Sequence, residues 1–460
     1  MTNHIFSGEK MLTRPHFSYI IVGKISWQVT IVERLLLKKL IEWKEKKHRK
    51  PLILWGARQV GKTWLMKEFG SSYFSNFVYI SFYNNSRMSS IFEEDYDAKR
   101  IINAIEVNQH IKIIPGETLL IFDEVQEAPK VVESLKYFCE DAPEYHVISA
   151  GSLLGVSLHE GVSFPVGKVD ELHLYPMNFR EFLLAIGEER LFEYINAADY
   201  GKVNEFSGLY KELLKKYLCI GGMPEVVGRF SDDRDFSESR EIQLSILSQY
   251  EGDFGKHISA NEMPRIRMTW QSLPMQLAKE NKKFFFGKIK EGARQKDFEK
   301  AIQWLVDAGL VYKVNKVQKP AMPLKSYVDF SSFKLFMVDV GLLGAMSELD
   351  IESVMNGNDI FVEFKGALIE QYVLEQLVSD TKYTPYYYSG EKSTYETDFL
   401  IQKGKAVVPV EVKAETNLRS KSLRAYYDKF SPALAYRLSS SDYKDQGWMK
   451  NIPLWCVSDI

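Results

Sequence analysis

One short motif restricts the fold of this chain more than any other feature. Residues 56–63 read GARQVGKT and match the pattern G-x-x-x-x-G-K-[ST], in which a glycine-rich loop and the start of a helix hold phosphate groups. Residues 51–55 (PLILW) have the apolar character of a buried strand, and residues 64–69 (WLMKEF) resemble the first turns of a helix. The motif therefore predicts a strand, a phosphate-binding loop and a helix in direct succession, within an α/β fold that binds a nucleotide.

Each part of this loop has a chemical task. Gly56 and Gly61 permit backbone angles and close approaches that a side chain would prevent. The loop amides and the helix N-terminus direct partial positive charge at the phosphates of ATP. We expect Lys62 to reach the β and γ phosphates and Thr63 to bind Mg²⁺. The predicted nucleotide-binding residues are Gly56, Ala57, Arg58, Gln59, Val60, Gly61, Lys62, Thr63 and Trp64.

A second apolar strand ends in two acids. Residues 118–122 (TLLIF) precede Asp123 and Glu124. An acid at the carboxyl end of a strand can hold the Mg²⁺ that bridges the phosphates, which is the role we expect of Asp123. Glu124 is placed to orient and deprotonate a water, as a catalytic residue. The structural alternative is a strand followed by a solvated turn. Combined with the phosphate loop, the pair predicts hydrolysis and not passive binding.

Other catalytic groups are less well defined by the sequence. The strand after the two acids ends in ISAGS, and Ser149 is the predicted residue that senses the γ-phosphate, with Ser152 as the alternative. A serine and glycine turn that caps the strand is the structural alternative. For a cation that stabilises developing charge, the candidates are Arg180, Arg229 and Lys168, and the sequence does not choose among them.

The order of apolar patterns indicates several domains. Apolar segments at 51–55, 77–82, 118–122 and 145–149 alternate with helical stretches, the first of them at 31–47, which predicts a three-layer parallel sheet. We predict these parts: an N-terminal extension without a clear element (1–30), a P-loop ATPase core (31–188), a helical subdomain (189–260), a winged-helix-like domain (261–345) and a further α/β domain (346–460).

The last two parts have recognisable outlines. Helical periodicity is followed by apparent strands at 309–314 and 325–330, and helices followed by a small hairpin are typical of a winged helix. A long helix then precedes the remaining predicted strands, at 385–389, 396–402, 406–412 and 453–457.

Composition limits the class of protein. A hydrophobic content of 45% and an aromatic content of 13% are ample for packed cores, and no run approaches the roughly 20 apolar residues of a membrane helix. Cys139, Cys219 and Cys456 are widely scattered, which favours free thiols in a reducing compartment. We therefore expect a cytoplasmic protein with no membrane segment.

The net charge of −2 is unevenly distributed. Residues 261–330 carry 14 lysines and arginines against 7 acids, a local net charge of +7. A basic excess of this size suits a polyanion, and we expect DNA as a partner. A solvated lysine-rich face is the structural alternative.

Several longer segments together resemble a known family. The runs WGARQVGKT, LLIFDEVQEAP, ISAGSLLG, YPMNFREFL and YLCIGGMPEVV are similar to a group of prokaryotic AAA-type ATPases, over about residues 31–435. The resemblance implies an AAA or STAND-like ATPase core, a winged-helix middle and a nuclease-like C-terminal domain of unknown function. Lys168 departs from the arginine expected at its position in the family.

The C-terminal region has a second constellation of charged residues. Asp398 ends one half of a predicted hairpin, and Glu411 and Lys413 share one face of its second strand. This arrangement resembles the D-(x)n-E-x-K core of the PD-(D/E)XK nuclease superfamily, in which acids chelate Mg²⁺ and a lysine assists. Glu370, on the preceding helix, matches that superfamily's additional acid. A solvated charged strand, or a related fold that binds without cleaving, is the alternative.

These patterns converge on two hypotheses for function. The first is Mg²⁺-dependent ATP binding and hydrolysis coupled to DNA binding or processing. The alternative is an ATP-gated regulatory switch whose nuclease-like domain binds DNA or a partner without cleavage. A transcription factor with a vestigial ATP site is a weaker third hypothesis. An oligomer or a protein partner is compatible with each, and the sequence does not identify the pathway.

Overall fold

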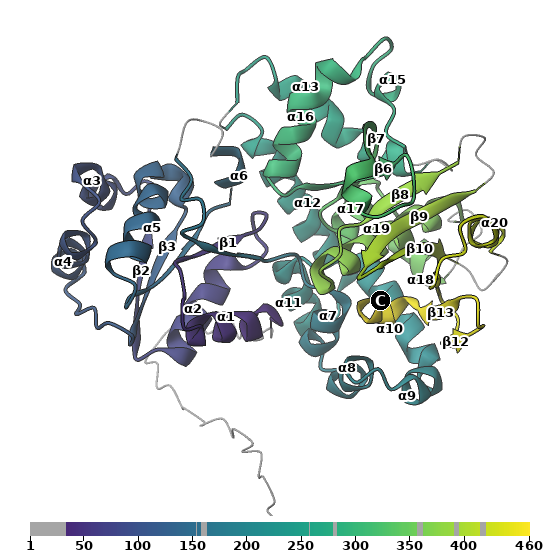
Figure 1. Cartoon of the computed structure of the whole chain (residues 1–460), viewed down its shortest axis with the longest axis horizontal. Helices are drawn as coiled ribbons and strands as arrows, with labels where there is room; N and C mark the ends of the chain where they lie inside the picture. Colours follow the sequence, from purple (N-terminus) through teal and green to yellow (C-terminus); the bar gives the residue numbers. More distant parts are fainter. Residues whose placement is uncertain are drawn as a thin grey trace, which may run out of the picture.

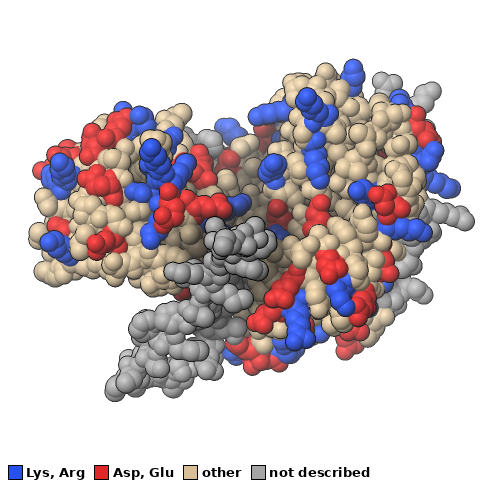
Figure 2. Space-filling view, turned by 60° about the horizontal axis from the view of Figure 1, so that its bottom comes forward, with Lys and Arg blue, Asp and Glu red and all other residues tan. Residues whose placement is uncertain are grey.

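The computed structural model describes residues 34–152, 154–157, 163–256, 258–278, 283–356, 362–390, 395–414 and 420–460. The predicted N-terminal extension (1–30) lies outside these residues. The described chain forms two lobes (Figure 1). The elements up to β5 make up the smaller lobe, in purple and blue, and the later elements make up the larger lobe, in teal to yellow. In Figure 2 the surface is hollowed between the lobes.

The smaller lobe is built on a parallel sheet of five strands. Its strands are β1 (Leu52–Trp55), β2 (Asn76–Ser81), β3 (Thr118–Asp123), β4 (His146–Ala150) and β5 (Asp170–His173). Their order in the sheet is β2-β3-β4-β1-β5. The parallel pairings confirm the α/β prediction, and β5 is a strand that the sequence analysis did not predict. Asp123 ends β3 and Glu124 follows it, whereas the phosphate loop follows β1, so β4 lies between the two strands.

Helices cover both faces of this sheet. They are α1 (Leu36–Glu45), α2 (Lys62–Tyr73), α3 (Ser86–Glu94), α4 (Ala98–Gln109), the short 3₁₀ helix η1 (Val125–Glu127), α5 (Pro129–Asp141) and α6 (Leu154–Ser157). Alternate side chains of β3 show the two faces. Leu119 and Ile121 pack into the core that contains α2, while Leu120 and Phe122 pack into the core that contains α4 and α5. Burial on both sides explains why β3 is apolar at almost every position.

The larger lobe begins with a helical region, as the sequence predicts. Its helices are α7 (Phe179–Ala185), α8 (Glu189–Asn196), α9 (Tyr200–Glu205), α10 (Ser207–Ile220), α11 (Pro224–Asp233) and α12 (Phe236–Asp253). Gly221, with φ of 73°, separates α10 from α11. The next glycine, Gly222, donates its amide to the carboxylate of Asp339 at 2.5 Å. The break between these helices is therefore tied to a distant part of the chain.

Further helices precede an antiparallel hairpin. They are α13 (Met263–Gln271), α14 (Leu273–Leu277), α15 (Phe286–Ile289) and α16 (Gln295–Asp307). The hairpin strands are β6 (Val311–Val317) and β7 (Val328–Met337), joined through the 3₁₀ helix η3 (Leu324–Tyr327). Pairing of Val311 with Met337 fixes their register. This is the succession of elements predicted for a winged helix, and the assignment itself stays a prediction.

A mixed sheet of eight strands dominates the C-terminal part. Its remaining elements are α17 (Val340–Met346), α18 (Ile351–Asn356), α19 (Val362–Asp380), β8 (Tyr386–Ser389), β9 (Glu396–Lys403), β10 (Ala406–Lys413), α20 (Lys421–Phe430), β11 (Tyr436–Ser439), β12 (Lys444–Asp445), β13 (Lys450–Pro453) and η5 (Leu454–Asp459). The strand predicted at 453–457 is wrong. Except for Pro453, which ends β13, these residues belong to η5, a 3₁₀ helix.

The eight-stranded sheet also includes the hairpin. The strand order is β12-β13-β11-β10-β9-β8-β6-β7, and Lys316 of β6 pairs with Tyr387 of β8. Elements from both sides of the predicted boundary at residues 345 and 346 therefore share one sheet. The proposed division of the chain into domains stays a prediction.

One continuous apolar core joins the two lobes. It extends from Leu40 on α1 to Ile460 at the C-terminus. At its centre, Phe179 packs edge-to-face against Tyr217 at 5.8 Å and against Tyr372 at 6.4 Å between ring centroids. Among the described residues, no helix is long and apolar enough to cross a membrane.

Candidate nucleotide-binding site

The phosphate loop lies at the carboxyl end of β1 and leads into α2. Gly56 has φ of 155°, and a Cβ on this residue would lie 2.4 Å from the carbonyl oxygen of Leu174. Gly61 has φ of 92°, in the left-handed region, directly before the first residue of α2. Both glycines of the motif are therefore required by backbone geometry, the first by close packing and the second by its conformation.

The Lys62 side chain is folded back onto the loop. Its Nζ donates to the carbonyl oxygens of Gly56 at 2.8 Å and of Ala57 at 2.7 Å. The residue is only 7% exposed, and burial lowers the pKa of Lys62 to about 8, against the opposing attraction of Glu124 and Asp123. This places a buried ammonium group within the loop, where phosphate oxygens would be the natural counter-charge.

The two predicted metal-binding residues are in direct contact. Thr63 Oγ1 donates to Asp123 Oδ2 at 2.5 Å, and the Tyr79 hydroxyl donates to the same oxygen at 3.1 Å. Burial raises the pKa of Asp123, while the hydrogen bond from Thr63 acts in the opposite direction. A hydroxyl and a carboxylate that meet at a helix N-terminus form an oxygen donor set of the kind that Mg²⁺ takes beside phosphates. The residues present therefore fit this metal.

Glu124 is held in position by neighbouring side chains. Its backbone has φ of 54°, a left-handed conformation that is uncommon for a residue with a side chain. Its Oε2 accepts hydrogen bonds from Gln126 Nε2 at 2.6 Å and from Ser152 Oγ at 3.1 Å. Ser152 reaches Glu124 because β4, which it follows, lies between the strand of the phosphate loop and the strand of the two acids.

The structure does not bring Ser149 to this site. Its side chain is fully buried inside the sheet, and its Oγ donates to the carbonyl oxygen of Leu52 on β1 at 3.3 Å. Ser149 therefore links β4 to β1, whereas Ser152 contacts the predicted catalytic acid. Of the two serines that the sequence suggested, the geometry selects the second.

A cavity of about 420 Å³ brings the site residues together. Lys62, Thr63, Asp123, Glu124 and Ser152 all line it. The start of α11 forms part of the opposite wall through Pro224, Glu225 and Gly228. The cavity therefore lies between the phosphate loop and the helical region, and its size suits a small-molecule ligand such as a nucleotide.

None of the three predicted cations lines this cavity. Lys168 precedes the amino end of β5, at the opposite end of the parallel strands from the P-loop, and pairs with Glu140 at 2.7 Å. Arg180 pairs with Asp380 at 2.9 Å, and Arg229 pairs with Glu238 at 2.7 Å. These three cations therefore form ion pairs outside the cavity. The identity of a charge-stabilising arginine stays open.

Two arginines that line the cavity were missed as charged groups of the site. Arg34 is 4% exposed, pairs with Glu181 at 3.1 Å and donates to the carbonyl oxygen of Val60 at 2.7 Å. Arg58, which the sequence analysis treated only as a loop position, pairs with Asp253 at the end of α12. The signal for Arg58 was its place inside the motif. Arg34 carries no such signal, because its partners are remote in sequence.

The phosphate loop makes two further contacts with α12. Gln59 Nε2 donates to Gln249 Oε1 at 2.8 Å, and the Tyr250 hydroxyl donates to the carbonyl oxygen of Arg58 at 2.8 Å. Together with the ion pair of Arg58, these bonds attach the loop to the helical region. A conformational change in the loop would therefore alter its contacts with the end of α12.

The C-terminal acids occupy neighbouring strands, as the sequence predicts. Val410 of β10 pairs with Phe399 of β9, so Glu411 and Asp398 occupy the next position on each strand. Asp398 Oδ2 accepts a hydrogen bond from the amide of Val412 at 2.7 Å, and Glu411 Oε1 lies 3.2 Å from Lys413 Nζ. Glu411 is 3% exposed. The predicted hairpin and its shared face are thus present.

A buried lysine from β7 lies among the remaining acids. Lys334 is 1% exposed, and its Nζ lies 3.3 Å from Glu396 and 3.9 Å from Glu370. Burial acts to lower the pKa of Lys334, but the attraction of the surrounding acids, Asp398 among them, outweighs it and the pKa is raised. This lysine was not predicted, because it comes from the hairpin assigned to another domain.

The acids of this region lie beside lysines, and their role in metal binding stays a prediction. Within the described residues, no three His, Cys, Asp or Glu side chains converge as the ligands of a metal ion would. Lys334 already supplies positive charge to Glu370 and Glu396, and Lys413 supplies it to Glu411. The donor set in this part of the chain is therefore compensated by the protein's own cations.

Comparison with known families assigns parts of the chain. Residues 48–183 match the family described as an AAA domain. Residues 211–353 match a domain of unknown function, DUF8612, and residues 365–457 match another, DUF4143. No curated protein matches the chain.

Several solved structures have a distant likeness to the chain. The Walker-type ATPase PABY2304 of Pyrococcus abyssi is 14% identical over 69% of this chain and 96% of its own, with a TM-score of 0.43. The Orc1 protein of Aeropyrum pernix, solved in complex with DNA, is 14% identical over 68% and 91%, with a TM-score of 0.29. DnaA from Aquifex aeolicus, bound to AMPPCP, is 14% identical over 59% and 85%, with a TM-score of 0.26.

These TM-scores are too low for any of the likenesses to support a functional argument. The match of residues 48–183 to the AAA family agrees with the geometry of the phosphate loop and with the five-stranded parallel sheet. Residues 48–183 form an AAA domain, with its P-loop at residues 56–63.

Proposed function

We propose that the AAA domain binds and hydrolyses ATP with Mg²⁺. The observation that carries this proposal is the convergence of Lys62, Thr63, Asp123 and Glu124 in one cavity, with the Glu124 carboxylate fixed by Ser152. A passive nucleotide-binding site needs the phosphate loop alone. A positioned carboxylate next to the predicted metal-binding acid adds the group that hydrolysis requires.

Each residue has a definable task in this reaction. Thr63 and Asp123 would hold Mg²⁺, which neutralises charge on the phosphates when it is bound. Lys62 binds phosphate oxygens through its ammonium group. Glu124 accepts a proton from the attacking water, and Ser152 and Gln126 keep its carboxylate oriented toward the cavity. Ser152 is thus a positioning residue.

Three variants test the assignment. Lys62→Ala is expected to lose tight ATP binding, because it removes the buried ammonium of the loop. Glu124→Gln is expected to bind ATP but to lose turnover by at least about a hundredfold. Glu127→Gln, on an exposed residue of η1, is the matched control and should retain wild-type turnover. Wild-type hydrolysis rates in Lys62→Ala and Glu124→Gln would refute the proposal.

The region of α15 and α16 supports coupling of this ATPase to DNA. Five basic side chains are exposed there, against two exposed acids, Glu291 and Glu299. The basic residues are Lys288, Lys290, Arg294, Lys296 and Lys300. Among the described residues, none of the five forms an ion pair, so each is available to a phosphate backbone. A helix that precedes an antiparallel hairpin is also the order of elements in a winged helix, the module that we propose for this region.

DNA binding is tested by its dependence on salt. We expect affinity for duplex DNA to fall steeply as salt rises, because phosphate contacts release counterions. The double variant Lys288→Ala/Lys290→Ala should weaken binding and reduce the salt slope by about 2. The matched control is Lys38→Ala/Lys39→Ala, on an exposed face of α1. A flat salt dependence, or equal losses in both double variants, would exclude this surface.

A specific observation favours the second candidate function, an ATP-gated switch without cleavage. We propose that the C-terminal sheet is a PD-(D/E)XK-like fold that binds DNA or a protein without cleaving DNA. Lys334 and Lys413 compensate the acids that cleavage would need for metal binding. Among the described residues, no group of three or more His, Cys, Asp or Glu side chains is placed to hold a metal ion.

Incubation with Mg²⁺ and linear, branched or single-stranded DNA tests this candidate. We expect no cleavage by the wild type. We also expect Lys334→Met to lose about 3 kcal/mol of stability or more, since it leaves buried carboxylates uncompensated. Partial recovery in Lys334→Met/Glu370→Gln would confirm the pairing. Cleavage that disappears in Glu411→Ala while ATP turnover persists would instead establish a nuclease.

A further inference from the structure

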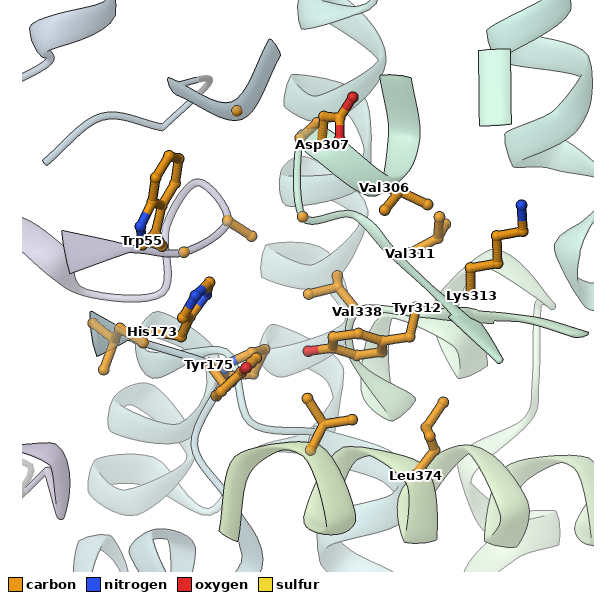
Figure 3. Close-up of a pocket in the computed structure, with 18 of the residues that line it drawn as sticks. Trp55, His173, Tyr175, Val306, Asp307, Val311, Tyr312, Lys313, Val338 and Leu374 are labelled. Atoms are coloured by element: carbon orange, nitrogen blue, oxygen red, sulfur yellow. The ribbon is translucent and has the colours of Figure 1, made fainter. Parts of the chain in front are cut away.

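A second cavity lies on the other side of the P-loop, between the two lobes. Its volume is about 510 Å³, and Figure 3 shows 18 of the residues around it. Gly56 and Ala57 of the P-loop line this cavity, and among the described residues Ser152 alone lines both it and the nucleotide cavity. The site residues Lys62, Thr63 and Asp123 do not line it. It is therefore a separate space that borders the nucleotide site.

Three aromatic rings form one wall of this cavity. The rings of Trp55 and His173 are nearly parallel, at 17° and 6.2 Å between centroids, and those of His173 and Tyr175 at 15° and 6.1 Å. Parallel pairing of Trp55 on β1 with His173 on β5 sets this spacing. Figure 3 shows the three rings in succession on one side of the cavity. Three nearly parallel aromatic rings, from β1, β5 and the residues just after β5, thus lie next to one another along this wall.

The opposite wall is aliphatic and belongs to the larger lobe. It is formed by Val306 at the end of α16, Val311 on β6 and Val338 after β7. Tyr312 extends from β6 toward Tyr175, with 6.3 Å between the ring centroids (Figure 3). A flat ligand between these walls would contact aromatic faces on one side and branched aliphatic groups on the other. Because one wall belongs to the smaller lobe and the other to the larger lobe, such a ligand would contact both lobes.

Charged groups occur among the lining residues as well. Lys313 and Lys382 contribute two ammonium groups and Asp307 contributes one carboxylate. A ligand with an uncharged aromatic ring and an anionic or hydroxylated substituent matches this combination. The Lys313 ammonium lies 4.5 Å from the centroid of the Phe333 ring, and an anionic substituent would add a counter-charge to it.

We propose that this cavity binds a nucleobase. Every base has a planar π face, and stacking of bases on aromatic side chains is a strong and sequence-tolerant interaction. The base enters between His173 and the valine wall, and its sugar and phosphate lie toward the lysines. The base belongs either to a free nucleoside or nucleotide or to an unstacked residue of single-stranded DNA. This proposal does not rest on the function proposed above.

Calorimetric titration tests the site on the full chain. The probes are adenosine, cytidine and a short thymidine oligonucleotide, each titrated into the Lys62→Ala variant and into wild type saturated with Mg-ADP. Saturation with Mg-ADP removes the nucleotide cavity from the measurement, and Lys62→Ala weakens the binding of phosphate-bearing probes there. His173→Ala deletes one stacking ring from an exposed residue, and His48→Ala, also exposed, is its matched control. Val306→Trp fills the cavity from the opposite wall without removing a ring.

We expect at least one probe class to bind, with affinity about fivefold or more weaker in His173→Ala, unchanged in His48→Ala and lost in Val306→Trp. If the free nucleosides show this pattern, the natural ligand is a small molecule. If only the oligonucleotide does, it is a strand of DNA. Equal binding of every probe to wild type, His173→Ala and Val306→Trp, or no binding at millimolar concentration, would overturn the proposal.

Discussion

The Glu124 carboxylate owes its orientation to two neighbours and to its own backbone. Gln126 and Ser152 both donate to Oε2, and the left-handed backbone directs the side chain away from the strand that precedes it. Such a conformation has an energetic cost and persists only where the surroundings hold it. Here the surroundings are the loop after β4 and the helix η1. We interpret this local strain as part of the positioning of the proposed general base.

The two serines after β4 give a direct test of this interpretation. In Ser152→Ala, kcat is expected to fall about tenfold with little change in KM, because the carboxylate loses one donor while ATP keeps its contacts. In Ser149→Ala, kcat should be unchanged and stability should fall by about 1 kcal/mol, since a buried bond between strands is lost. Steady-state kinetics and urea denaturation distinguish the two. A loss of kcat in Ser149→Ala alone would reverse the assignment.

His146 makes stability dependent on pH. It is 5% exposed at the start of β4, where its ring packs against Phe74 at 4.9 Å and Trp43 at 5.9 Å. Burial lowers the pKa of His146 to about 4. The unfolded chain therefore binds the proton more tightly than the native state, so stability falls as the pH drops through 6.5 and levels off below about 4.

We expect this residue to cost about 2 kcal/mol of stability near pH 5, relative to neutral pH. The variant His146→Phe keeps the aromatic packing and cannot be protonated. The difference in unfolding free energy between variant and wild type should therefore grow by that amount between neutral pH and about pH 5. Exposed His48, replaced in the same way, serves as the control. A difference that does not change with pH would show that His146 titrates normally.

At the scale of elements, one junction connects three distant segments. Gly222 donates its amide to Asp339 at 2.5 Å and accepts from the amide of Met177 at 2.6 Å. Tyr217 adds a hydrogen bond from its hydroxyl to the carbonyl oxygen of Met177 at 2.6 Å. The connections before α7, between α10 and α11, and before α17 thus meet at one point. A Cβ on Gly222 would lie 2.0 Å from the Met177 carbonyl oxygen, so only glycine fits.

The variant Gly222→Ala is expected to destabilise the protein by about 3 kcal/mol, because the three atoms nearest the added methyl group are backbone atoms of Met177 and cannot move aside cheaply. Gly208→Ala is the matched control, since nothing lies within 4 Å of a Cβ at that helical glycine. It should change stability by less than about 1 kcal/mol. Thermal denaturation of both variants decides the point. Equal effects would show that the junction tolerates a side chain.

The sequence predicted the elements with strong local patterns. β1, β3 and the P-loop were recognised because an apolar run, a glycine motif and a helix follow one another without interruption. β5 was missed, because only one of its four residues DELH is apolar and the segment resembles a loop. The strand predicted at 453–457 failed for the opposite reason, since an apolar run of that length is equally compatible with a buried 3₁₀ helix.

The candidate sites show the same limit. Residues of the P-loop and the two acids after β3 were found from motifs, but the choice between Ser149 and Ser152 depends on which side of β4 each residue faces. The positions of Arg34 and Lys334 depend on contacts across more than sixty residues of chain, to Glu181 and Glu396. No local spacing encodes such contacts. The proposed cavity for a nucleobase exists only after two lobes have come together.

At the scale of the whole molecule, the AAA domain is not separable from the rest. The core that begins at Leu40 continues to the C-terminus, and Phe179 packs against residues of α10 and α19. The P-loop itself is attached to α12 through Arg58 and Gln59. We infer that nucleotide binding and the state of the larger lobe are mechanically linked.

A fragment that ends at residue 188 tests this inference. It retains the five-stranded sheet and the complete P-loop but exposes the aromatic side chains of α7 and loses the contacts of α12. We expect the fragment to aggregate or to unfold without a cooperative transition, and to bind ADP far more weakly than the full chain does. Calorimetry and circular dichroism provide the measurements. A fragment that folds cooperatively and binds ADP as the full chain does would show that the lobes are independent.

The P-loop lies between the nucleotide cavity and the second cavity, and its residues line both of them. Gly56 and Ala57 face one of them, Arg58 and Lys62 face the other, and Lys62 is bonded to the carbonyl oxygens of the first pair. We expect phosphate to draw the ammonium away from these carbonyls, which would remove two hydrogen bonds from the wall of the neighbouring cavity. Thermodynamic linkage makes this effect mutual: by whatever factor a nucleotide alters the affinity of the second cavity for its ligand, that ligand alters the affinity for the nucleotide. The binding of each ligand would then change the affinity for the other through one backbone segment, the P-loop.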